Sequence, residues 1–191
     1  MLAFKDRMDK KSKNLNNQLY NLLMAKRSFI NATELVTFLI KRLEESGQEY
    51  IVDDPLFDAV FESFIITYAR PFTVSIPHGK LPNRITNKFN DQRKACHQDL
   101  MDKRNKYHAH SDGTVNKIQV VPPGVRINKN IEPSDHASYI FHKEIWKVRR
   151  YHFIYDHIRK LTLDIIDELE KLEKLIYPNG MPNKVFELKA L

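Results

Sequence analysis

Apolar residues recur every three or four positions along much of the chain, and this spacing restricts the fold more than any other sequence feature. Such spacing gathers the apolar side chains on one face of a helix, where they can be buried together. Three segments follow it over many turns. We therefore expect long helices over residues 14–45, 55–70 and 138–177.

Local signals mark the ends of these helices. Asp54 followed by Pro55 supplies a cap and a proline in the first turn, and Gly47 ends the segment before it. Asn31 followed by Glu34 has the spacing of a capping box. We therefore expect a joint in the first helix near residues 28–31.

A further helix is predicted from about residues 87–90 to residue 108, and its composition is polar. Between Asp91 and His110 most side chains are charged or polar, so this helix lies on the surface or lines a polar cleft. Three prolines and a glycine between residues 71 and 88 favour a loop before it. Lys80, Arg84 and Lys88 lie in that loop and add positive charge.

After Gly113 two short β-branched runs surround Pro123–Gly124, which suits a type II turn and predicts a small hairpin over residues 118–127. Two strands alone do not make a fold. The expected class is all-α: an antiparallel four-helix bundle with a β-hairpin between the third and fourth helices. We expect one domain over residues 1–191, with its core in 14–176 and loose ends at 1–13 and 178–191.

Composition excludes several protein classes. The 191-residue chain carries 31 Lys and Arg against 24 Asp and Glu, a net charge of +7 that hints at a polyanionic partner. No apolar run is long enough to span a bilayer, and no apolar segment follows the basic N-terminus as in a secretory signal. The single Cys96 cannot form an internal disulfide. A cytoplasmic location away from membranes is the expectation.

Functional chemistry is densest between Asp102 and Asp112, and three interpretations compete for it. His108, His110 and Asp112 alternate as metal ligands do on a strand, but the preceding residues predict a helix, so we assign no metal. Nucleophilic catalysis by Cys96 is also disfavoured, since His97 beside it points to another helix face.

The third interpretation follows from what RNA cleavage needs in the absence of a metal or other cofactor. A base that titrates near pH 7 must take the proton of the ribose 2′-hydroxyl, and His supplies one. A fixed cation must hold the phosphate as its charge builds, and Arg supplies that. Arg104, Asn105 and His110 contain this set, with Lys103 and Lys106 beside them. We expect these two lysines to form one basic, RNA-binding cleft with Lys80, Arg84 and Lys88 of the preceding loop.

The run R-N-K-Y-H-A-H-S-D, in a polar helix of a predicted four-helix protein, resembles the signature of HEPN domains (higher eukaryotes and prokaryotes nucleotide-binding). That signature is an Arg, usually followed by a polar residue such as Asn, and then a His after four to six intervening residues; five residues separate Arg104 from His110. The resemblance implies a metal-independent endoribonuclease, commonly a toxin of a toxin–antitoxin, phage-defence or abortive-infection system. It assigns Arg104, Asn105 and His110 to an active site that two subunits of a homodimer share.

Two details restrict this assignment. Arg104 and His110 lie about 120° apart around an ideal helix, so His110 must lie at or beyond the helix end; His108 is the alternative on the face of Arg104. Asp112 stands where some HEPN toxins have the Tyr that a partner nucleotidyltransferase modifies. An antitoxin of that kind is therefore not expected, and any neutralising partner would be of another kind. The alternative function is a non-catalytic module that binds RNA, nucleotide or a partner protein.

Overall fold

The chain is helical in the computed structural model, which describes residues 2–49, 54–73, 80–108, 118–124, 136, 138–141 and 146–180. Within these residues it has five α-helices, one 3₁₀ turn and two short strands. The helices are α1 (Leu2–Ser46), α2 (Pro55–Ala69), α3 (Asn83–Thr86), α4 (Asp91–His108) and α5 (Val148–Ile176). The 3₁₀ turn is η1 (Arg70–Phe72), and the strands are β1 (Ile118–Val121) and β2 (Ser138–Phe141).

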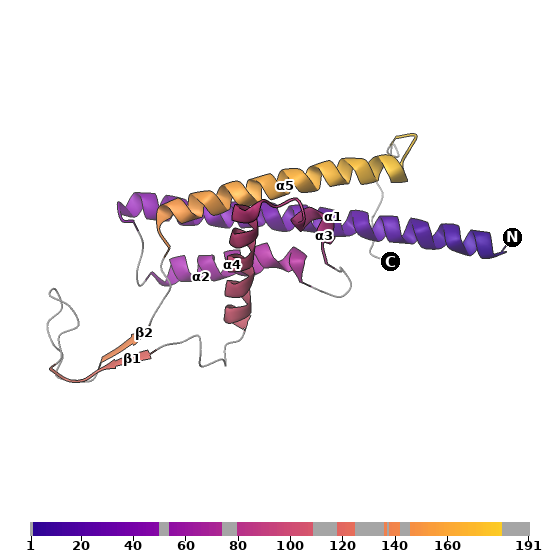
Figure 1. Ribbon diagram of the computed structural model, residues 1–191. Coiled ribbons are helices and arrows are strands. Elements are labelled where there is room, and N and C mark those ends of the chain that lie inside the picture. The colour runs from indigo at the N-terminus through magenta and orange to yellow at the C-terminus, as the bar shows by residue number, and fades with distance from the viewer. Residues whose placement is uncertain are drawn as a thin grey trace.

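Helices α1 and α5 form the main layer of the molecule. They run side by side in opposite directions, and α2 packs along α1 (Figure 1). Helix α4 contacts α2 and α5, but it crosses the direction of the other long helices instead of lying along them (Figure 1). The all-α prediction is therefore confirmed, and the prediction that all four long helices lie alongside one another is wrong for α4.

Helix α1 is continuous through the expected joint at residues 28–31. Phe29 is fully buried there, and Ser28 is nearly so, which fixes this turn against the rest of the core. The hydroxyl of Thr33 donates to the Phe29 carbonyl at 2.8 Å, within the regular ladder of the helix. Gly47 ends α1 as predicted, in a left-handed conformation with φ of +66°.

The start of α2 follows its sequence signal. The Asp54 carboxylate accepts hydrogen bonds from the backbone N–H groups of Leu56 and Phe57, at 3.0 and 3.1 Å, and Pro55 occupies the first turn. These bonds satisfy N–H groups that have no partner inside the helix. The predicted cap is confirmed.

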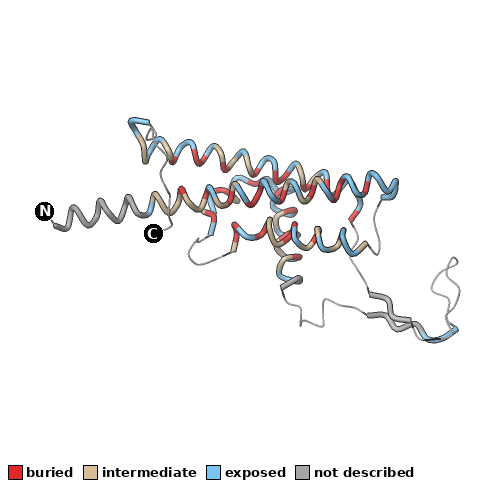
Figure 2. Tube along the Cα trace, turned by 180° about the vertical axis from the view of Figure 1, so that it is seen from behind, coloured by how far each residue is buried: buried red, intermediate tan, exposed pale blue. Residues whose placement is uncertain are grey.

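Buried side chains of α1, α2 and α5 meet in one core, seen as the red inner faces of the helices in Figure 2. Aromatic rings are concentrated where η1 turns back over α1. Phe29 lies 5.6 Å from Phe72 and 6.1 Å from Tyr68 between ring centroids. This aromatic cluster covers the inner side of α4, where the polar groups described below are buried.

The strand pairing differs from the predicted hairpin. β1 pairs with β2 in antiparallel register, with Ile118 opposite Phe141 and Val121 opposite Ser138. The turn at Pro123–Gly124 is present, with φ of +76° at Gly124, but the expected partner run at 125–127 lies outside the described residues. Residues 138–141 were expected to begin the last helix, so that prediction is wrong and α5 begins at Val148.

In the part of the chain that the structure describes, no helix is both long enough and apolar enough to cross a membrane.

Candidate functional site

The polar helix α4 buries one narrow face and exposes the rest. Its buried side chains recur at helical spacing as Arg93, Cys96, Leu100 and Lys103, so two of the four are cationic. The remaining surface of α4 is largely charged or amide side chains in contact with water. This explains how a helix so poor in apolar residues packs against α2 and α5.

Arg104 and Asn105 lie near the C-terminal end of α4. The Arg104 guanidinium donates to the Asn105 side-chain oxygen at 3.1 Å, and Asn105 and Lys106 are exposed. Among the described residues Arg104 forms no ion pair with a carboxylate. The negative end of the helix dipole favours cations at this position. Among the described residues the pair therefore presents a partly exposed guanidinium that Asn105 holds and that no carboxylate neutralises.

The two histidines of the motif are only partly described. The structure describes α4 as far as His108, and the residues that follow lie outside the described part of the chain. The side chain of His108 lies outside it too, as does the whole of His110. The structure therefore leaves untested whether either imidazole reaches the Arg104 guanidinium.

Lys103, predicted to contact RNA, is packed inside the protein. Only 5% of Lys103 is exposed, and its ammonium lies 4.7 Å from the centre of the Trp146 ring. Trp146 is itself buried at the approach to α5, where Arg150 also stacks on it and pairs with Asp99 at 2.7 Å. A cation over an aromatic face is stabilised there. Lys103 therefore anchors the C-terminal half of α4 to the start of α5.

Two of the other predicted RNA contacts, Arg84 and Lys88, lie near the opposite end of α4, whereas Lys106 lies beside Arg104. Glu168 of α5 accepts from Arg84 at 2.9 Å, from Lys88 at 2.9 Å and from Lys171 at 3.2 Å. The Lys88 hydrogen bond, with those of Arg84 and Lys171, lowers the pKa of Glu168 to about 2 against the opposing effect of burial. Three cations around one carboxylate leave a net positive surface.

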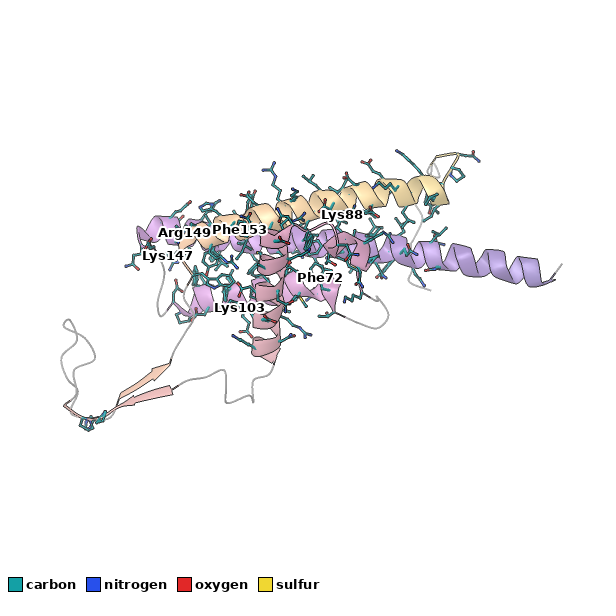
Figure 3. The ribbon with its side chains drawn as sticks, viewed as in Figure 1. Phe72, Lys88, Lys103, Lys147, Arg149 and Phe153 are labelled. Carbon is teal, nitrogen blue, oxygen red and sulfur yellow. The ribbon has the colours of Figure 1, made fainter. Side chains whose placement is uncertain are left out.

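The two basic groups therefore do not form one cleft. About 20 Å of helix separates the start of α4, beside Lys88, from Arg104. Figure 3 shows Lys88 toward α5 and Lys103 toward the other end of α4. The single basic cleft expected from the sequence is replaced by two separate positive areas along α4.

A buried hydrogen-bonded chain, which sequence reasoning did not find, links α2, α4 and α5. The Tyr68 hydroxyl lies 2.8 Å from His97 Nδ1 and 3.0 Å from His157 Nε2. Arg93 donates to His157 Nδ1 at 3.4 Å and to the Asp164 carboxylate at 2.9 Å. Its guanidinium also lies 4.3 Å from the centre of the Phe89 ring. Every one of these buried polar side chains thus has a partner.

The environment holds both imidazoles neutral at pH 7. Burial, with the nearby positive charge of Lys80, lowers the pKa of His97 to about 4. Burial, with the positive charge of Arg93, lowers the pKa of His157 to about 3. Neutral imidazoles suit a structural role for this hydrogen-bonded chain of side chains. Neither histidine contacts a carboxylate, among the contacts given above, that would stabilise a charged ring.

Because of these buried histidines, we expect the stability of the fold to fall at acidic pH. Because the folded pKa of His157 lies below its unfolded value of 6.5, its contribution to stability is present above pH 6.5 and is lost as the pH falls. We expect His157 alone to lower the free energy of unfolding by about 2 kcal/mol between pH 7 and pH 5. Urea denaturation at each pH measures this. His157→Gln should flatten the dependence, whereas the control His152→Gln, at an exposed histidine, should not; an equal slope in both variants would contradict the assignment.

Cys96 takes no part in an accessible site. It is fully buried, and that burial raises the pKa of its thiol to about 11. The thiol is therefore protonated at neutral pH and packs as a small apolar side chain, as the sequence indicated. In the described part of the chain no group of three or more His, Cys, Asp or Glu side chains is placed to hold a metal ion.

Comparison of the chain with protein-family models, with curated proteins and with solved structures finds no match. The resemblance to HEPN domains therefore stays a prediction from the residues of the motif.

Proposed function

We propose that this protein is a metal-independent endoribonuclease of the HEPN type, with an active site built around Arg104. The proposal includes the HEPN-like arrangement of four helices. The observation that carries the proposal is the partly exposed Arg104 guanidinium near the end of a polar helix, which Asn105 holds and which pairs with no carboxylate among the described residues. A guanidinium in that state is available to a phosphate. The proposal includes the biological role common in that family: the protein acts as a toxin or phage-defence effector that a partner neutralises.

The proposed reaction is transfer of the RNA phosphate to its neighbouring 2′-oxygen. His110 takes the proton of the 2′-hydroxyl, the 2′-oxygen forms a bond to phosphorus, and the bond from phosphorus to the 5′-oxygen breaks. The departing 5′-oxygen takes up a proton from an imidazolium or from water. Arg104 stabilises the charge that builds on the phosphoryl oxygens, and Asn105 orients the phosphate. The second His and Arg of a homodimer complete the site.

Outside the centre of the site, the accessible cations extend the binding surface. Lys106 is exposed two residues from Arg104, and the net positive area of Arg84, Lys88 and Lys171 around Glu168 lies farther along α4, with Lys80 exposed before it. Electrostatic attraction to phosphates does not require direct base contacts. An RNA strand laid along α4 would reach both areas.

The chemistry of the products tests this function. We expect the purified protein to cut single-stranded RNA in excess EDTA and to leave 2′,3′-cyclic phosphate and 5′-hydroxyl ends, because the nucleophile is the substrate's own 2′-oxygen. Mass spectrometry of the fragments measures both ends. An RNA that carries 2′-deoxyribose at the cut position is the control and should stay intact. Cleavage only with added divalent metal, or 5′-phosphate ends, would contradict the proposal.

A further inference from the structure

Side chains of α4 and α5 form an alternating stack of cations and aromatic rings near the end of α4 that carries Arg104. The Lys103 ammonium lies 4.7 Å from the centre of the Trp146 ring. The Arg150 guanidinium lies 5.7 Å from the centre of the Trp146 ring and 5.8 Å from that of Phe153. We call these four residues the cation–aromatic stack. It begins one residue before Arg104 in the sequence.

The cation–aromatic stack is buried at one end and open to solvent at the other. Lys103 and Trp146 are 5% and 8% exposed. The Arg150 side chain is 34% exposed, and Phe153 is half-buried. An ion pair of 2.7 Å with Asp99 also holds the Arg150 guanidinium. Part of a guanidinium and part of an aromatic ring therefore lie together at the surface, in positions that buried contacts fix.

Positive charge lies beside the open end of the stack. Figure 3 shows Lys147, Arg149 and Phe153 at the start of α5. Lys147 pairs with Glu49 at 2.9 Å, whereas Arg149 is exposed and forms no ion pair among the described residues. Two cations against one carboxylate leave this part of the surface positive. Such a surface attracts a phosphate backbone.

We propose that the open end of the stack, formed by Arg150 and Phe153, receives an unpaired base of single-stranded RNA, while Arg149 contacts the phosphate backbone beside it. This inference rests on the proposed function, which makes RNA the ligand, and it restricts the substrate to RNA that is unpaired at this point. Aromatic rings and guanidinium planes both stack on bases. Base pairing would hide the face and edges of the base inside a duplex.

The stack also connects this base-binding surface with the proposed cleavage site. Lys103 lies next to Arg104 in α4, and its contact with Trp146 joins this half of α4 to the start of α5. A base on Phe153 therefore lies at the same end of α4 as the guanidinium that would hold the phosphate to be cut. The positive area around Glu168 lies near the other end of α4.

A comparison of two ligands separates stacking from charge. One is an RNA oligonucleotide without internal pairing, and the other is a ribose-phosphate oligomer of the same length without bases. Fluorescence anisotropy in EDTA measures their binding to the His110→Ala protein, which should not cut the RNA. We expect the RNA to bind about tenfold more tightly than the abasic oligomer. Adding Phe153→Leu keeps an apolar side chain but removes the ring, and should abolish most of that preference.

Three further variants in the same background are controls. Tyr155→Leu changes another half-buried aromatic residue of α5, on whose ring no cation stacks among the described residues, and should keep the preference. Arg149→Ala should weaken both ligands alike, by about threefold, as expected for a phosphate contact. Phe153→Tyr retains the ring and should keep the preference. It tests the proposal even if circular dichroism shows that Phe153→Leu is unfolded.

Equal affinity of the His110→Ala protein for the two ligands would overturn the proposal. So would a folded Phe153→Leu variant that keeps the preference, a Phe153→Tyr variant that loses it, or a Tyr155→Leu variant that loses as much as Phe153→Leu. Cleavage by the parent protein in EDTA tests the proposed function separately. A protein that shows the ring-dependent preference but does not cut would contradict the nuclease alone, and one that cuts without the preference would contradict the stacking alone.

Discussion

Arg104→Ala is expected to lower the single-turnover rate of RNA cleavage by about a hundredfold or more, the usual cost of removing a group that stabilises transition-state charge. The Arg104 side chain has one described hydrogen bond, to Asn105, and that bond is local to the end of α4. Its removal should therefore leave the fold intact. Rates measured with saturating protein separate this effect from weaker RNA binding.

Two variants sharpen the Arg104 experiment. Arg104→Lys keeps the charge but loses the planar fork, so we expect an intermediate rate. Arg159→Ala removes an exposed arginine from α5 and should cut at the parent rate. If Arg104→Ala cuts as fast as Arg159→Ala, Arg104 does not stabilise the transition state.

Arg93→Ala is expected to lower the free energy of unfolding by about 3–5 kcal/mol, the range for breaking a buried ion pair by removing one partner. The Arg93 side chain is 9% exposed, and its guanidinium binds Asp164 at 2.9 Å and stacks on Phe89. It also donates to His157. Truncation leaves a cavity, a carboxylate without its cation and an imidazole nitrogen without its donor. Chemical denaturation measures the loss.

An exposed arginine of the same kind is the matched control. Arg84 also binds a carboxylate of α5 at 2.9 Å, but its side chain is 48% exposed and Glu168 keeps two other cations. We expect Arg84→Ala to cost about 1 kcal/mol or less, as is usual for a surface ion pair. Equal losses in the two variants would show that Arg93 contributes no more than a surface cation.

The helices were predictable where the local signal is unambiguous. Asp54 begins α2 because its carboxylate accepts from the first N–H groups of the helix, and Pro55 fits the first turn. Gly47 ends α1 because it adopts a positive φ that few other residues tolerate. The start of α5 was not predictable in this way. Tyr139 and Ile140 fit the apolar spacing of a helix and also the β-branched and aromatic preference of a strand, and pairing with β1 decides between them.

Tertiary arrangement decides the features that local pattern misses. The capping-box spacing of Asn31 and Glu34 suggested a joint, but burial of Phe29 favours a continuous helix. The crossing of α4 depends on where its short buried face meets α2 and α5. Nothing in the spacing of its charged residues encodes that direction.

The candidate site was predictable only in part. The sequence identifies the cations Lys103 and Arg104, but it does not show that Trp146, distant in the chain, lies over the first of them. The chain through Tyr68, His97 and His157 joins three helices for the same reason. A signal was present, since His157 stands on the apolar stripe of α5 among buried residues, and a polar residue there requires a partner.

Single-turnover cleavage in EDTA by His110→Ala, beside the parent protein, tests the central claim most directly. The account predicts that the parent protein cuts RNA to 2′,3′-cyclic phosphate ends, and that His110→Ala still binds the RNA but cuts it at least about a hundredfold more slowly. Equal rates for the two proteins, or binding without cleavage by the parent, would contradict it.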